Sequence, residues 1–72
     1  MPTDDRTRAA WVAAFAARLG VEPPDDDSVA ILLDMAGVAA HASERTSAPL
    51  ACWLAGRAGL SPAEALSIAE DI

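Results

Sequence analysis

The fold is decided by the stretch SVAILLDMAGVAAHA, residues 28–42. Its apolar side chains are spread almost all the way round a helix, and Asp34 is the one acidic residue among them. A helix that is apolar on every side belongs in the interior of a protein. We therefore predict a central, most buried helix from Ser28 to about Ala42 or Glu44, with Asp26 or Asp27 as its N-cap.

A second helix is predicted upstream, from about Asp5 to Leu19. Its apolar residues recur three and four positions apart and share one face: Trp11, Val12, Phe15 and Leu19. Its start can be capped by Asp4, Asp5 or Thr7, and Gly20 can take the left-handed conformation that closes a helix. The following Val21-Glu22-Pro23-Pro24 is predicted to be a short linker, because proline cannot continue a helix.

Two further helices are predicted downstream. Thr46, Ser47 and Pro49 mark one start, and Leu50, Trp53 and Leu54 supply an apolar stripe that ends before Gly59. The stretch Ser61-Pro62-Ala63-Glu64 is a capping-box pattern that opens a last helix from Pro62 to about Glu70. Residues 1–72 are thus predicted to form a single helical domain, an all-α, compact bundle of about four short helices.

Composition narrows the class of function. The 72 residues are 53% hydrophobic and carry a net charge of −6, from eleven acidic residues and five arginines without a lysine. Such a chain is apolar enough to fold but too acidic for nucleic acid or anionic membranes, so we expect a protein partner with a basic face. The lone Cys52, the missing signal sequence and the lack of a membrane-spanning stretch predict a cytoplasmic protein.

The most polar cluster is His41, Glu44 and Arg45. If the central helix persists, spacings of three and four place these side chains on one face, where they could form a docking patch. Alternatively, these side chains could stabilise the C-terminal end of the helix. His41 and Arg45 would then face its negative pole, and Glu44 would bond Arg45 or the backbone. End-of-helix pairs of this kind are common, so the second interpretation is favoured.

Catalytic and metal sites are not expected. Cys52 with His41 and Glu44 could in principle make a nucleophile, base and orienting acid, but a free cysteine in an alanine-rich helix is ordinarily a small apolar packing residue. One histidine and one cysteine do not make a metal site, and the sequence predicts no cofactor. Trp11, Phe15 and Trp53 are predicted to pack in the core.

Asp27-Ser28-Val29 suggests a different function. Acyl and peptidyl carrier proteins are acidic helical bundles of similar size that carry phosphopantetheine on a serine in an Asp-Ser-Leu setting, and this stretch resembles that motif. The resemblance would make Ser28 a prosthetic-group site. The chain departs from the family's pattern, because Asp25 and Asp26 stand where a glycine is expected and the preceding linker is short.

A longer resemblance rests on VAAHASERTSAPL, residues 38–50, followed by WLAG, residues 53–56. With Trp11, Phe15, Leu19-Gly20-Val21 and residues 32–36, this pattern resembles a small helical domain of unknown function. That domain occurs mainly in actinobacteria, alone or fused behind molybdenum cofactor guanylyltransferase. The block H-x-x-E-R-x-x-A-P-L is its most specific part, and it is matched by His41, Glu44, Arg45 and Pro49.

The resemblance implies a role beside molybdenum cofactor (molybdopterin guanine dinucleotide) maturation or a molybdoenzyme such as formate dehydrogenase. Nothing in the chain corresponds to the guanylyltransferase's nucleotide-binding loop, so we expect a non-catalytic accessory or adaptor module that binds a protein partner. His41, Glu44, Arg45 and Pro49 are the candidate interaction patch. The alternatives are a carrier protein modified at Ser28 and a self-associating structural helical bundle.

Overall fold

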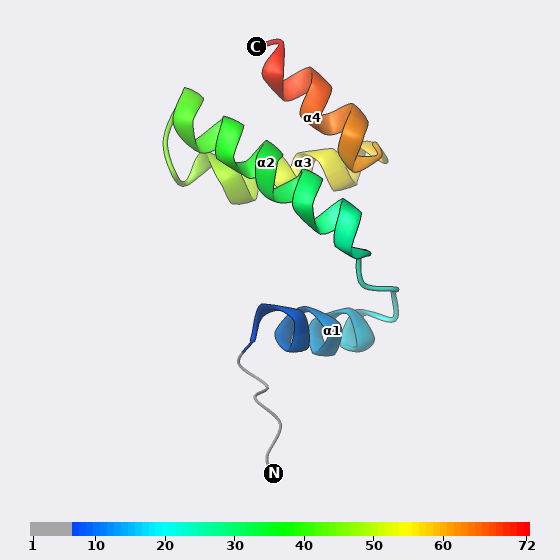
Figure 1. Cartoon of the computed structure of the whole chain (residues 1–72). Coiled ribbons are helices and arrows are strands. Elements are labelled where there is room, and N and C mark those ends of the chain that lie inside the picture. The colour runs from blue at the N-terminus through cyan, green and yellow to red at the C-terminus, as the bar shows by residue number, and fades with distance from the viewer. Residues whose placement is uncertain (1–6) are drawn as a thin grey trace.

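The computed structural model describes residues 7–72 and shows four helices in that part of the chain (Figure 1). They are α1 (Arg8–Leu19), α2 (Asp26–Ala42), α3 (Ser47–Ala58) and α4 (Pro62–Glu70). The described residues contain no strand, and none of their helices has the length and apolar character needed to cross a membrane. The predicted all-α bundle of about four short helices is confirmed.

α2 occupies the centre of this arrangement. It packs against both α3 and α4, and one of its middle residues, Met35, is only 2% exposed. Met35 is the one large side chain that is fully buried among the residues described. The prediction of a central, most buried helix is therefore confirmed.

α1 stands apart from the other helices. In Figure 1 it lies beyond the start of α2, at the far end of an extended linker. Within residues 7–72, no packing as extensive as that of α2 on α3 and α4 joins α1 to another helix. An open hollow of about 380 Å³ separates Val12 and Ala13 of α1 from Val29 and Leu32 of α2.

The predicted helix ends are confirmed at four positions. Thr7 caps α1 by accepting the Ala10 N–H at 3.2 Å, and Gly20 and Gly59 close α1 and α3 with φ angles of 74° and 73°. The capping box of α4 is complete, because Ser61 Oγ accepts the Glu64 N–H and Glu64 Oε1 accepts the Ser61 N–H. Asp4 and Asp5, the other candidate caps, lie outside the described residues.

The start of α2 differs from the prediction. Asp25, not Asp26 or Asp27, is the N-cap, and its Oδ1 accepts the Ser28 N–H at 2.8 Å. The extended backbone of Asp25, with ψ at 171°, lets it cap a helix that begins at Asp26, two residues after Pro24. Asp26 and Asp27 then fall in the first turn, where their charges face the positive end of the helix dipole.

The predicted burial of the aromatic residues is wrong. Trp11 is 58% exposed, Phe15 50% and Trp53 62%. The buried residues of the described chain are Ala16, Met35 and Ala65. The reason is that α1 has no neighbouring helix along its aromatic side, while α3 turns its alanines rather than Trp53 towards the interior.

Candidate interaction site

One side of α3 presents large side chains to solvent. Pro49, Trp53 and Arg57 recur every four residues, so they line up along one edge of the helix, and all three are exposed. The Arg57 guanidinium lies over the Trp53 ring, 5.5 Å from its centroid, as in a cation–π contact. We call these three residues the α3 outer face.

The α3 outer face follows from how α3 packs. The residues of α3 that are half-buried are the small ones: Ser47, Ala48, Ala51, Cys52 and Ala55. Small side chains let a helix approach its neighbour closely, and they place the opposite side of the helix in solvent. Pro49, Trp53 and Arg57 are on that opposite side.

The loop between α2 and α3 adds two charges beside this face. The Ser47 N–H donates to the Glu44 carbonyl at 2.9 Å, and the Ala48 N–H donates to the Arg45 carbonyl at 3.1 Å. These two turns join the loop to the first turn of α3, while the Glu44 and Arg45 side chains remain exposed. The loop therefore lies at the N-terminal end of the α3 outer face.

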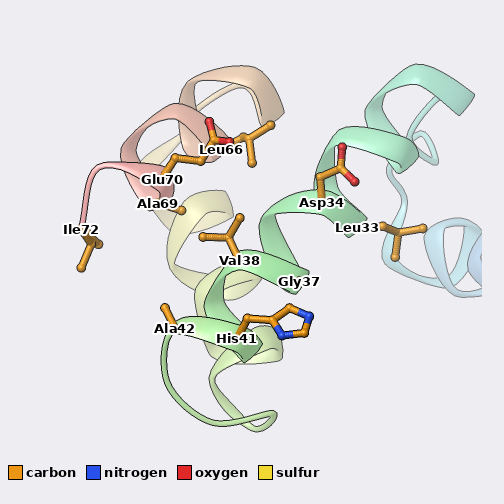
Figure 2. A pocket seen from close by; sticks show the side chains of 10 residues that line it. All are labelled: Leu33, Asp34, Gly37, Val38, His41, Ala42, Leu66, Ala69, Glu70 and Ile72. Atoms are coloured by element: carbon orange, nitrogen blue, oxygen red, sulfur yellow. The ribbon is translucent and has the colours of Figure 1, made fainter.

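His41 does not lie on the same surface as the other residues of the predicted interaction patch. His41 lies in the last turn of α2 and lines an open hollow of about 750 Å³ between α2 and α4, together with Asp34 and Glu70 (Figure 2). Pro49 lies in the first turn of α3. Of the predicted patch, Glu44, Arg45 and Pro49 thus belong to α3 and the loop before it, and His41 belongs to a different surface.

The favoured capping interpretation of this cluster is supported for His41, which lies in the last turn of α2 and so faces the negative end of that helix, but not for a bond from Glu44. In residues 7–72 no side-chain hydrogen bond or ion pair joins His41, Glu44 and Arg45. The end of α2 is closed instead by the Ser43 N–H, which donates to the Ala39 carbonyl at 3.1 Å. All three side chains are exposed and free to contact another molecule.

The remaining candidates lie elsewhere. Cys52 is a half-buried free thiol on α3, and it does not line the hollow that contains His41. Ser28 is half-buried in the first turn of α2, and its N–H is already bonded to Asp25. The part of the chain that is described holds no group of three or more His, Cys, Asp or Glu residues placed to bind a metal ion.

Two carboxylates have perturbed acidities. Hydrogen bonds from Ser28, chiefly from its backbone N–H, lower the pKa of Asp25 below its ordinary value of 3.8. Hydrogen bonds from Ser61, again chiefly from the backbone, lower the pKa of Glu64 below 4.5. Both groups are exposed residues at helix starts, and their role is to hold the helix ends rather than to form part of the α3 outer face.

Sequence reasoning missed Arg57 as a member of the site, as well as Asp34 and Glu70 beside His41. The signal for Arg57 was present, because it stands four residues after Trp53 on a predicted helix. Asp34 stands two turns before His41 on the same helix, but Glu70 reaches this hollow only through the packing of α4 on α2. No sequence spacing gives that contact.

The fold and the exposed helix face define a small all-α domain. The chain belongs to the family described as a domain of unknown function (DUF6457), whose model matches residues 3–71. The resemblance to a small domain of unknown function is thus confirmed. No curated protein and no solved structure matches the chain.

Proposed function

We propose that this protein is a non-catalytic accessory module that binds a protein partner through the α3 outer face and the adjoining loop. The observation that carries the proposal is the exposure of Trp53, at 62%, beneath a stacked Arg57. Tryptophan and arginine dominate the binding energy of protein interfaces. Trp53 and Arg57 stay exposed to water on a helix whose half-buried residues are all small, and a partner that covers this face would account for their exposure.

The geometry of this face suits binding. Arg57 restricts the Trp53 ring by lying over it, so less side-chain freedom is lost when a partner closes on the pair. Glu44 and Arg45 extend the face with charges of both signs, which fix the register of a complex more than its strength. The α3 outer face and its loop carry two arginines and one glutamate, so the chain's acidic excess lies outside this face.

The partner we propose is a protein of molybdenum cofactor maturation, such as molybdenum cofactor guanylyltransferase, or a molybdoenzyme such as formate dehydrogenase. Support comes from the H-x-x-E-R-x-x-A-P-L block, which resembles the domain found fused to that enzyme. Three residues of the block, Glu44, Arg45 and Pro49, lie in or beside the α3 outer face. The module would act in the cytoplasm by binding, and it would supply neither a cofactor nor a catalytic group.

A direct binding titration tests this proposal. The full chain is titrated calorimetrically into the purified guanylyltransferase of the same organism, and separately into its formate dehydrogenase. Trp53→Ala should weaken the complex at least about 30-fold, which is the effect of losing a principal anchor. Arg45→Ala should weaken it less, because a charge at the rim is partly screened by water.

Leu33→Ala is the matched control. Leu33 is also a large apolar residue about half exposed, at 49%, but it lies on α2 away from the α3 outer face. Its truncation should leave the affinity within about threefold of the original. No binding to either protein, or equal losses for Trp53→Ala and Leu33→Ala, would overturn the proposal.

A further inference from the structure

The structure contains an apolar groove that the chain itself does not fill. α3 and α4 both pack on α2, and two hollows of about 300 and 330 Å³ open between them. The hollows share Ala51, Leu54, Ala69 and Ile72, so they form one continuous channel along α3. We call this channel the α3–α4 groove.

The groove has the dimensions of a helix-binding site. Its lining runs along α3 from Ser47 to Ala58, which is about 16 Å at 1.5 Å per residue. Small residues form much of its floor, whereas Leu54, Ile68 and Ile72 on its walls are 60%, 56% and 98% exposed. A groove with a small-residue floor and branched walls accepts the large side chains of an apposed helix.

α1 carries a stripe that matches this groove. Trp11, Phe15 and Leu19 lie four residues apart, along about 12 Å of helix, and each is at least half exposed. The Trp11 and Phe15 rings stack with their centroids 5.1 Å apart, which makes one continuous aromatic ridge. We call these three residues the α1 stripe.

α1 and the α2–α4 unit that contains the groove carry net charges of opposite sign. Residues 7–19 carry Arg8 and Arg18 and no acidic residue, whereas residues 26–72 carry seven acidic residues and two arginines. α4, one wall of the groove, bears Glu64 and Glu70 and is followed by Asp71. A cationic helix placed against this acidic unit is attracted to it, so the charge pattern favours α1 over the other helices as the occupant.

We propose that two copies of the chain form a dimer in which the α1 stripe of each copy lies in the α3–α4 groove of the other. α1 reaches a second copy rather than the groove of its own chain because Pro23 and Pro24 favour an extended linker, and α1 lies apart from α2–α4 (Figure 1). Reciprocal exchange of one element is a common route to a symmetric dimer.

The exposed surfaces of the α1 stripe and the α3–α4 groove are large enough for a specific dimer interface. Aromatic side chains bury about 150–250 Å² each, and roughly half of that remains exposed on Trp11 and Phe15. The α1 stripe, with Leu19 included, would therefore bury about 300 Å², and an equal area of the groove brings each contact to about 600 Å². Two such contacts give about 1,200 Å² in total, at the lower limit of specific interfaces. The dimer should therefore form reversibly and dissociate on dilution.

The first test is the mass of the full chain by sedimentation equilibrium across a dilution series. We expect a monomer–dimer equilibrium, and Trp11→Ala should raise the dimer dissociation constant at least about 30-fold. Trp53→Ala is the matched control, since Trp53 is equally exposed but lies outside the groove, and it should change that constant less than about threefold. Circular dichroism of each variant checks that the helices are retained.

The second test locates the contact. A chain carrying Cys52→Ser and Ala14→Cys, spin-labelled at position 14 beside the α1 stripe, is mixed with ¹⁵N-labelled original chain. Broadening of the Leu54 and Ile68 amide signals of the ¹⁵N-labelled chain would support the proposed dimer. A monomer at every concentration, or broadening confined to α1, would overturn it. Neither result depends on the partner proposed for the α3 outer face, because Trp11 and Trp53 report separately on the two surfaces.

Discussion

Replacing Met35 by alanine should remove a large share of the protein's stability. Met35 is 2% exposed and is the one large side chain buried in the described part of the chain. Truncating a buried methionine to alanine costs about 2–5 kcal/mol. A domain of 72 residues has a total stability on the order of 4–11 kcal/mol. We expect a loss of about 3 kcal/mol, measured by urea unfolding monitored by circular dichroism at fixed protein concentration.

Two further variants make this prediction decisive. Leu33→Ala removes a similar volume from the same helix at a 49% exposed position, and it should cost less than about 1 kcal/mol. Met35→Leu keeps the volume and should cost less than about 1.5 kcal/mol. If Met35→Ala were no more destabilising than Leu33→Ala, the α2–α3–α4 contact around Met35 would not be the core of this fold.

The remaining predictions concern the helix ends. Because the pKa values of Asp25 and Glu64 are lowered in the folded chain, their contribution is complete above their ordinary values of 3.8 and 4.5 and is lost as the pH falls through the lowered values. The double variant Asp25→Asn, Glu64→Gln keeps both caps but cannot titrate, so its melting temperature should fall less between pH 5 and pH 2 than that of the original chain; equal slopes would contradict the assignment. Gly59→Ala should lower the melting temperature, because φ is 73° there and a left-handed alanine costs about 1–2 kcal/mol. Gly56→Ala should raise it, because Gly56 is inside α3 with open space where the Cβ would be and alanine favours a helix by roughly 1 kcal/mol; a shift of the same sign for both glycines would refute this account.

The helix ends were largely predictable because their signals are local. A capping box needs only Ser61 and Glu64, three residues apart, and a left-handed glycine needs only the turn before it. The start of α2 was misplaced because three consecutive aspartates, residues 25–27, can each cap a helix. The choice of Asp25 depends on how early the chain can turn after Pro24, which composition does not specify.

The α3 outer face was only partly predictable. Glu44, Arg45 and Pro49 were found from a motif, and the structure places them in or beside α3. Trp53 was expected in the core, because an aromatic residue on an apolar stripe is usually buried. Its exposure depends on which side of α3 meets α2, and alanine-rich helices offer several sides of nearly equal hydrophobicity.

The sequence by itself determined the helical class, the number of helices and most of their ends, since these depend on residues within a few positions of one another. Only the tertiary structure decided that α1 stands apart from α2–α4 and that Trp11, Phe15 and Trp53 remain in solvent. The physical reason is that periodicity shows which residues of a helix share a side. Whether another helix covers that side depends on contacts between segments far apart in the chain.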